Sequence, residues 1–234
     1  MVSRLLDELK RSFFPHHCFL CNEVLHPHQR LCRECADKAP YILPPICERC
    51  GRGADECHCG KHRRAFARCI SPFYHKGVAQ GGIYTLKSEG FAVTVAGFAT
   101  EMAEVVRREY GGIPFDFVTA VPLHKRELLD RGFNQAEKLG QALAQRMGIP
   151  YATVLTKITV TAPQKELTAV ERSGNLLGVF DVCGEVAGKT ILLVDDVITT
   201  GATLDECAKM LKIFGAEEVY AVTAAAACLS NEDE

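Results

Sequence analysis

The chain has 234 residues, of which 47% are hydrophobic and 24% charged, and its formal net charge at pH 7 is -2. This composition excludes wholesale disorder, and the small net charge excludes nucleic-acid binding by overall charge alone, although a local basic patch is still allowed. The length suits one sizeable α/β domain with a small appendage.

The first fifteen residues predict a short amphipathic helix. Leu5, Leu6, Leu9 and Phe13 recur at helical spacing, but charged residues interrupt the stretch, so it is not the apolar core of a signal peptide. No uncharged apolar run elsewhere in the sequence is long enough to span a bilayer. We therefore expect a cytoplasmic protein without a membrane span, in which the twelve cysteines need an explanation other than disulfides.

Eight of the cysteines form four close pairs in the first quarter of the chain. The pairs are Cys18 with Cys21, Cys32 with Cys35, Cys47 with Cys50, and Cys57 with Cys59. A C-x2-C pair on a tight turn points two thiolates at one ion, and two such pairs make a four-cysteine zinc site. The sequence predicts one or two zinc ions, because the last pair is C-x-C and His58 or His62 could replace one of its cysteines. Grouping of neighbouring pairs and interleaved grouping, first with third and second with fourth, both fit the spacing.

These pairs define a small N-terminal module over residues 1–64. A zinc ion with four protein ligands has no open position for a substrate, so it is structural and replaces the core that so short a module cannot build. We expect the module to be a structural cap or docking surface, with nucleic-acid binding as the alternative. Three later single cysteines, Cys183, Cys207 and Cys228, are predicted to be small buried apolar residues.

Residues 65–234 have the alternating pattern of a parallel α/β domain. Strands are predicted at 67–75, 115–123, 189–196 and 217–227, and helices at 92–110, 134–148 and 203–214. Because the strands are rich in Val, Ile and Ala and alternate with helices, we expect a mainly parallel sheet that is covered on both faces.

The stretch ILLVDDVITTGAT, residues 191–203, ends a buried strand in two adjacent acids and then enters a loop of Thr and Gly. In an open parallel sheet, ligands lie beyond the carboxyl ends of the strands, so Asp195 and Asp196 would face a ligand. The loop offers hydroxyls, N–H groups and a helix dipole to a phosphate, and Gly201 permits close backbone approach. Carboxylates accept hydrogen bonds from hydroxyls and repel a second phosphate, so the pattern predicts a ribose 5-phosphate.

This stretch resembles the phosphoribosyl pyrophosphate (PRPP) loop of type I phosphoribosyltransferases. The motifs CFLCNEVL, LCREC, CERCG, YTLKSEG, VPLHKRELLDRGFNQAEKLGQALA and QKELTAVERSGNLLGVFDV make the chain similar to the ComF family, from about Cys18 to Ala227. These are competence-associated, phosphoribosyltransferase-like proteins with an N-terminal zinc ribbon. The resemblance implies a type I phosphoribosyltransferase fold over residues 65–234, with a central mainly parallel sheet flanked by helices, preceded by a single or double zinc ribbon.

The resemblance also implies a set of site residues. The two aspartates would hold the ribose hydroxyls, the loop would hold the 5-phosphate, and Mg²⁺ would accompany the pyrophosphate. The implied catalytic residues are Asp195, Asp196, Arg131 and Lys87. The implied PRPP-binding residues are Asp195, Asp196, Val197, Thr199, Thr200, Gly201, Ala202, Thr203, His124 and Arg126. For the cationic residues of these two sets, ordinary surface solvation is the alternative.

A segment at 161–180, containing Gln164, Arg172 and Asn175, lies where family members carry a mobile loop that closes over the pyrophosphate. A plain surface loop is the alternative for this segment.

The implied reaction is Mg²⁺-assisted displacement of pyrophosphate at ribose C1 through an oxocarbenium-like transition state, with a role in DNA uptake. No nucleobase pocket is legible in the sequence, so the acceptor and the existence of turnover are left open. The alternative is a non-catalytic protein that senses PRPP or another ribose 5-phosphate, or that binds single-stranded DNA or a DNA-uptake partner. The sequence makes no prediction of the oligomeric state.

Overall fold

The computed structural model describes residues 16–26, 29–57, 59, 63–158 and 179–228. The helix predicted at the N-terminus lies outside these ranges, as do His58 and His62. Most of the loop predicted at 161–180 also lies outside them, including Gln164, Arg172 and Asn175.

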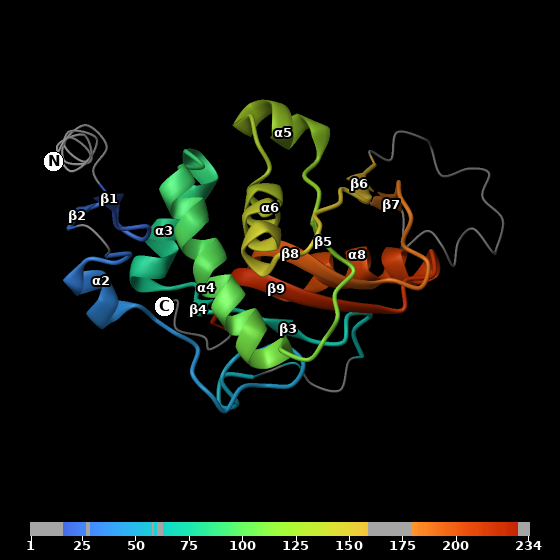
Figure 1. Cartoon of the computed structure of the whole chain (residues 1–234), viewed down its shortest axis with the longest axis horizontal. Coiled ribbons are helices and arrows are strands. Elements are labelled where there is room, and N and C mark those ends of the chain that lie inside the picture. Colours follow the sequence, from blue (N-terminus) through green and yellow to red (C-terminus); the bar gives the residue numbers. More distant parts are fainter. Residues whose placement is uncertain (1–15, 27–28, 58, 60–62, 159–178, 229–234) are drawn as a thin grey trace, which may run out of the picture.

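A sheet of five parallel strands forms the centre of the molecule (Figure 1). Its two long strands, β8 (Thr190–Ile198) and β9 (Glu218–Ala226), pair along their whole length. The short strand β5 (Phe117–Ala120) pairs with β8 on one side, while β3 (Cys69–Ile70) and β4 (Phe73–Tyr74) both pair with β9 on the other. The parallel sheet predicted from the sequence is confirmed.

The strand predicted at 67–75 is broken into β3 and β4 by Ser71 and Pro72. Proline has no amide proton for the ladder, and the Pro72 carbonyl instead accepts a 2.9 Å hydrogen bond from the amide of Ile42. The side-chain hydroxyl of Ser71 lies 2.6 Å from that of Thr223 on β9. At this break, the edge of the sheet is therefore hydrogen-bonded to the preceding segment around Ile42.

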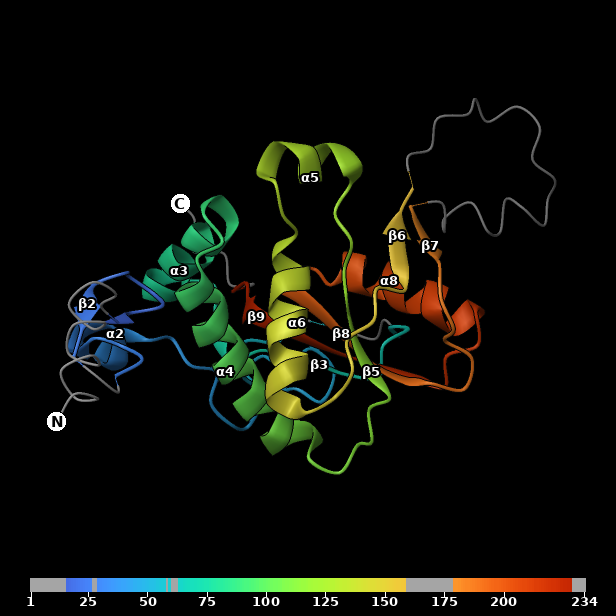
Figure 2. The same ribbon diagram turned by 45° about the horizontal axis from the view of Figure 1, so that its top comes forward.

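Helices cover both faces of the sheet (Figure 2). One face carries α3 (Gly77–Ser88), α4 (Ala92–Tyr110) and α6 (Gln135–Met147), and the other carries α8 (Ala202–Ile213). The predictions of α4, α6 and α8 agree with the structure to within one residue at each end, whereas α3 was not predicted. In α6 the side chain of Asn134 accepts hydrogen bonds from two backbone amides of the first turn, and Gly148 ends the helix with φ of 69°.

The core is divided between the two faces because side chains alternate along β8. Leu192 and Val194 pack on the side of α4 and α6, and Ile191 and Leu193 pack on the side of α8. All four are fully buried, and burial of such a side chain contributes about 1.5–3 kcal/mol. This alternation holds β8 rigidly up to the residue before the two aspartates.

Short elements surround this core. They are β1 (His16–His17), β2 (Val24–Leu25), α2 (Arg33–Lys38), α5 (Lys125–Arg131), β6 (Leu155–Lys157) and β7 (Phe180–Val182). The strands form two antiparallel hairpins, β1 with β2 and β6 with β7. In both views α5 stands above the sheet, apart from the other helices (Figures 1 and 2). In the described part of the chain, no helix is long and apolar enough to cross a membrane.

The single cysteines differ in burial. Cys207 on α8 is fully buried, as predicted. The same prediction is wrong for Cys183, which is exposed just after β7, and Cys228 is only half-buried beyond the end of β9. Both depart from the prediction because they lie just outside strands, where the chain leaves the core.

Candidate functional site

The two aspartates lie where β8 extends past its neighbour. The pairing of β5 with β8 runs from Phe117 opposite Ile191 to Ala120 opposite Val194 and then stops. On the other side β8 continues in register with β9, with Asp195 opposite Thr223. The acidic residues are therefore supported by β9 on one edge, while the edge toward β5 carries no strand within the described structure.

The two acids of this pair lie in different surroundings. Asp195 accepts a 2.8 Å hydrogen bond from the backbone amide of Asp196. Burial, together with the neighbouring carboxylate of Asp196, raises the pKa of Asp195 well above its ordinary value. Asp196 is 16% exposed, and its Oδ2 lies 3.1 Å from Nζ of Lys87. The structure thus brings together an acid that resists ionisation and an acid with a cationic partner.

Lys87 reaches the acid pair from the last turn of α3, far away in sequence. The side-chain amide of the buried Gln135 lies 3.5 Å from the Lys87 carbonyl, which connects this turn to the start of α6. His75, just after β4, belongs to the same neighbourhood: burial and the Lys87 ammonium lower its pKa, and Asp196 opposes this. Sequence analysis missed His75 because no motif surrounds it.

The loop after the acids turns directly into α8. Gly201 has φ of 80°, a left-handed conformation that favours glycine. Thr199 and Thr200 are exposed, as are Ala202 and Thr203 at the start of the helix. The Thr200 hydroxyl accepts a 3.3 Å hydrogen bond from the Ala202 amide. Backbone amides at such a turn, together with the helix dipole, can bind a phosphate.

The predicted cations that follow β5 lie on the short helix α5. His124 caps this helix: its Nδ1 accepts a 3.2 Å hydrogen bond from the Arg126 amide, and its own amide donates to Glu127. The side chains of Arg126 and Arg131 are exposed. The helix is held to the β6–β7 hairpin by Glu127 and Lys157, whose charged atoms are 3.6 Å apart. Of the predicted cations, Lys87 contacts the acid pair.

Two arginines from the N-terminal module contact the backbone carbonyls of the loop. Sequence analysis did not single them out. Arg52 is 2% exposed and donates to the carbonyls of Ile198, Thr199 and Ala227. Arg64 donates a 2.6 Å hydrogen bond to the Thr200 carbonyl. Arginines that follow a cysteine pair have no local signal that identifies a distant acceptor, so only the tertiary structure shows this contact.

The eight cysteines form two groups of four, each with all four sulfur atoms within 4.8 Å of one another. The groups are Cys18, Cys21, Cys32 and Cys35, and Cys47, Cys50, Cys57 and Cys59. The sulfur atoms of Cys21 and Cys32 are 3.7 Å apart and those of Cys50 and Cys57 are 3.8 Å apart. Tetrahedral zinc with Zn–S bonds of about 2.3 Å needs a separation of about 3.8 Å, which these two distances match. In the second group Cys59 lies closer, 3.4 Å from Cys47 and 2.9 Å from Cys57, so these sulfur atoms would move apart slightly to bind the ion. Neighbouring pairs are grouped, and the interleaved grouping is excluded.

We call the turns that carry these groups the first knuckle, residues 18–35, and the second knuckle, residues 47–59. The first docks through Phe19, whose ring lies 5.2 Å from that of Phe98 on α4. A Cβ atom on Gly97 would lie 2.1 Å from the Phe19 ring, so the helix surface must be bare at that point. The second knuckle docks on the sheet edge, where the Cys69 amide donates a 2.8 Å hydrogen bond to the Arg49 carbonyl.

Two family models match the chain. The model described as phosphoribosyl transferase domain matches residues 134–233, and the model described as double zinc ribbon domain matches residues 9–70. Together with the two cysteine groups, the second match supports structural zinc in both knuckles.

Similar proteins are found in several bacteria. A protein of Salmonella typhi named DNA utilization protein YhgH is 31% identical over 215 residues, covering 88% of this chain and 94% of that protein. Competence protein F of Haemophilus influenzae is 27% identical over 232 residues, covering 89% and 96%. Among solved structures, a glutamine PRPP amidotransferase from B. subtilis is 25% identical with a TM-score of 0.40, covering 57% of this chain and 27% of the enzyme.

Proposed function

Because the chain belongs to the ComF family of competence-associated proteins, which join a zinc ribbon to a phosphoribosyltransferase domain, we propose that it binds PRPP beyond the carboxyl end of β8 and transfers its phosphoribosyl group. The acceptor is not identified. The domain boundary that goes with this proposal lies near residue 64, between a zinc module and the transferase domain that begins at residue 65.

One observation carries the proposal. The acid pair lies near the end of β8, which is held in place by β9, and the phosphate-type loop follows directly and leads into α8. The carboxyl groups of Asp195 and Asp196 suit the ribose hydroxyls, since a carboxyl oxygen accepts hydrogen bonds in either protonation state. Thr199 to Thr203, with the start of α8, suit the 5-phosphate. The ammonium of Lys87 lies 3.1 Å from Asp196, so it is within reach of a ligand that contacts both the acid pair and the loop.

In the proposed reaction the bond between C1 and the pyrophosphate oxygen breaks, and its electron pair leaves with the pyrophosphate. A nucleophilic atom of the acceptor then bonds to C1 through its lone pair, and the proton that this atom carried is released to water. The charge that develops on the leaving group would be neutralised by Mg²⁺ bound together with PRPP. Carboxylate oxygens such as those of Asp196 are suitable partners for that ion or for its water ligands. We propose that Lys87, Arg126 and Arg131 supply further positive charge, the last two from α5.

Calorimetry with PRPP and Mg²⁺ tests the binding step. We expect the wild type to bind, and Asp195→Ala and Asp196→Ala to lose binding. Asp181→Ala is the matched control, since Asp181 is an exposed acid on β7 and its side chain accepts a local hydrogen bond from the amide of Val182. Absence of binding by the wild type would contradict the proposal.

Turnover requires a second measurement. Pyrophosphate release should be followed with a panel of nucleobases, amines and single-stranded DNA as acceptors. Release that depends on one class of acceptor and is lost in Asp196→Ala would identify the reaction. Binding of PRPP without release for any acceptor would favour a sensor.

A second candidate function is binding of single-stranded DNA without phosphoribosyl transfer. It is favoured by the names of the relatives, which refer to DNA utilization and competence, and by a basic cleft of about 510 Å³ at the junction of the two modules. Its charged lining residues are Arg49, Arg63, Arg64, Lys212 and Glu218, of which Lys212 and Glu218 form an ion pair at 2.7 Å. A bound DNA backbone would release counterions, so its affinity should fall steeply with salt.

A gel shift with single-stranded oligonucleotides at several salt concentrations tests this candidate. Arg63→Glu should weaken binding, whereas Lys38→Glu on α2 makes the same charge change outside the cleft and should not. Equal effects of the two variants would show that only overall charge matters and would contradict a specific cleft.

We also propose that the protein works in the cytoplasm. All twelve cysteines are free of disulfides in the structure, and eight of them form the metal groups. Thiolate ligands are maintained in a reducing compartment.

A further inference from the structure

The buried guanidinium of Arg52 joins the second knuckle to the phosphate loop. Its Nε donates a 2.8 Å hydrogen bond to the carbonyl of Ala227, and its Nη2 donates to the carbonyls of Ile198 at 3.1 Å and Thr199 at 2.6 Å. The side chain lies in the fold with only 2% of the residue exposed. One side chain therefore contacts the end of β8, the first residue of the loop and the residue that follows β9.

The backbone around Arg52 is held firmly by the second knuckle. The carbonyl of Arg52 accepts a 2.7 Å hydrogen bond from the amide of Cys47, a predicted metal ligand. The preceding Gly51 has φ of 66°, and a Cβ atom there would lie 2.4 Å from the carbonyl oxygen of Cys69. The following Gly53 donates its amide to the Tyr74 hydroxyl at 2.8 Å. The position of Arg52 is thus determined by the knuckle on one side and the sheet edge on the other.

The contact orients the loop as well as holding it. In a planar trans peptide, the carbonyl and the following amide point in opposite directions. Arg52 draws the carbonyls of Ile198 and Thr199 toward the knuckle, and Arg64 draws the carbonyl of Thr200 the same way. The amides of the next residues in each case, Thr199, Thr200 and Gly201, must then point away from the arginines. Successive amides directed to one side form the kind of concavity that binds an anion.

The positive charge of Arg52 also favours an anion in the loop. Among the residues that the structure describes, its hydrogen-bond acceptors are all backbone carbonyls. Burial of a guanidinium is costly unless dipoles or opposite charges compensate it. A phosphate in the loop would add compensation across a single peptide layer, where the effective dielectric is lower than in water. Arg52 therefore favours an anion in the loop through the field as well as through geometry.

We propose that Arg52 is a positioning residue of the phosphate loop and that the second knuckle is part of the ligand site through it. The nature of the ligand rests on the proposed function, whereas the coupling between knuckle and loop does not. Loss of the metal from the second knuckle frees the turn that holds Arg52, and the loop then loses the orientation of its amides. The first knuckle has no such connection within the described contacts, because its docking partners are α3, α4 and Phe73 of β4.

The test compares Arg52→Met with Arg30→Met, which removes an arginine from the first knuckle. Hydrogen exchange is followed by NMR at two amides that report on the loop, Ala227, which donates to Ile198, and Asp205, which donates to Gly201. Arg52→Met should speed exchange at both by at least about tenfold, the effect expected when a charge-assisted hydrogen bond is lost. Val121, bonded to β8 before the acids, should be unaffected. Arg30→Met should change none of the three.

A metal arm uses the same reporters. Cys59→Ser should remove the ion of the second knuckle and speed exchange at Ala227 although Arg52 is present, whereas Cys21→Ser should remove only the ion of the first. Zinc content is measured on each variant. Unchanged exchange at Ala227 in Arg52→Met or in Cys59→Ser would overturn the proposal.

A ligand arm separates positioning from general loosening. The affinity for ribose 5-phosphate should fall about tenfold or more in Arg52→Met, while the affinity for Mg²⁺-pyrophosphate stays within about twofold of the wild type. Equal losses for both ligands would reduce Arg52 to a structural residue and overturn the proposal. If Arg52→Met does not fold, Arg52→Lys is compared with the wild type instead: its ammonium cannot hold all three carbonyls in the same places as the guanidinium, so exchange at Ala227 should be faster than in the wild type. Unchanged exchange in Arg52→Lys would then overturn the proposal. If the wild type binds neither ligand, the proposed function fails and the exchange data still decide the coupling.

Discussion

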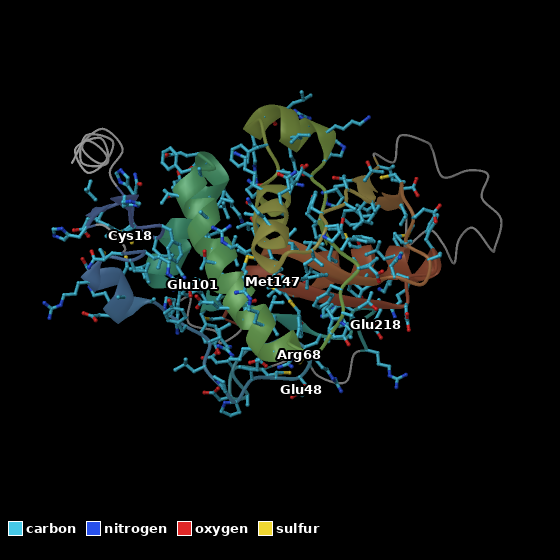
Figure 3. The ribbon with its side chains drawn as sticks, in the orientation of Figure 1. Cys18, Glu48, Arg68, Glu101, Met147 and Glu218 are labelled. Atoms are coloured by element: carbon cyan, nitrogen blue, oxygen red, sulfur yellow. The ribbon has the colours of Figure 1, made fainter. Side chains whose placement is uncertain are left out.

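The two cysteine knuckles use the same four-thiolate chemistry but attach to the domain in different ways. The first presents the ring of Phe19 to a bare stretch of α4 at Gly97, an apolar contact. The second is attached by hydrogen bonds, from the Cys69 amide to Arg49 and from Arg52 to the phosphate loop. Cys18 and Glu48, one in each knuckle, mark their separate places in Figure 3, with Glu48 next to Arg68 of the sheet edge.

Because of this difference, the first knuckle mainly affects the stability of the fold, and the second also affects the geometry of the phosphate loop. Apolar contact gains free energy in proportion to buried area and has little directional preference. Hydrogen bonds to backbone carbonyls are directional, so they determine the orientation of peptide groups as well as their distance. We therefore expect damage to the first knuckle to appear as lost stability, and damage to the second to appear as lost ligand affinity also.

Removal of the metal should have the largest effect. Structural zinc contributes about 10–16 kcal/mol of apparent binding free energy in small zinc modules at neutral pH, so a strong chelator should unfold residues 16–57 while β8 and β9 stay protected. Hydrogen exchange with mass spectrometry measures both regions at once. Loss of protection in β8 and β9 together with the knuckles would contradict an independently stable sheet core.

Gly97→Ala tests the apolar docking. The new Cβ would lie 2.1 Å from the Phe19 ring, so Phe19 must move, at a cost of about 1–3 kcal/mol for overpacking. Denaturant unfolding measures this, with Gly112→Ala as control because a Cβ there meets no atom within 4 Å. PRPP affinity should be unchanged. A parallel fall in affinity would mean that the first knuckle also reaches the site.

Gly51→Ala is the matching change in the second knuckle. Its backbone has φ of 66°, and the new Cβ would lie 2.4 Å from the Cys69 carbonyl, so both strain and a clash of about 1–3 kcal/mol are expected. Here the affinity for ribose 5-phosphate should fall together with the stability, because Arg52 is displaced. Calorimetry that finds full affinity in a destabilised Gly51→Ala protein would remove the distinction between the knuckles.

Asp195→Asn shows whether the site itself carries a stability cost. The pKa of Asp195 in the folded protein is raised above the unfolded value of 3.8. At pH values between the unfolded and the folded pKa, the folded protein therefore binds more protons than the unfolded chain, and stability falls as pH rises. The amide side chain removes this term, so we expect the variant to be more stable than the wild type at neutral pH and to show a flatter profile. Thermal unfolding from pH 4 to pH 8 provides the comparison, and PRPP binding should be lost. An unchanged pH profile would contradict the raised pKa.

Arg30→Ala should have the smallest effect. Arg30 is 51% exposed and lies 3.1 Å from Glu104 and 3.4 Å from Glu101 on α4. The pair with Glu104 is exposed, and such pairs contribute about 0–1 kcal/mol, less at high salt. The side chain of Glu101 is only 7% exposed, but it keeps the Tyr41 hydroxyl as a hydrogen-bond partner when Arg30 is removed. Chemical denaturation at low and high salt should show a small difference that disappears at high salt. A loss of several kcal/mol would mean that the first knuckle depends on ion pairs rather than on Phe19.

Local patterns explain how much of this fold could be predicted. Helix α6 was bounded to within one residue because Asn134 is a strong start signal and Gly148 a strong stop signal. Strands β8 and β9 were placed to within two residues because long runs of Val, Leu, Ile and Ala have few alternatives. The helix α3 was not predicted because its glycines weaken the helical pattern. The strand at 67–75 was predicted as continuous, since the pairing of the residues around Pro72 depends on β9, which is distant in sequence.

The sequence by itself determined the chemistry: four cysteine pairs, an acid pair at the end of a buried strand, and a Thr and Gly loop before a helix. Spacing and side-chain type are local properties, so they can be read along the chain. Only the tertiary structure decided which cysteine pairs share a site, that Lys87 meets Asp196, and that Arg52 lies behind the phosphate loop. These contacts join residues that are distant in the chain, and they exist because packing of the sheet and hydrogen bonding of its edge bring those residues together.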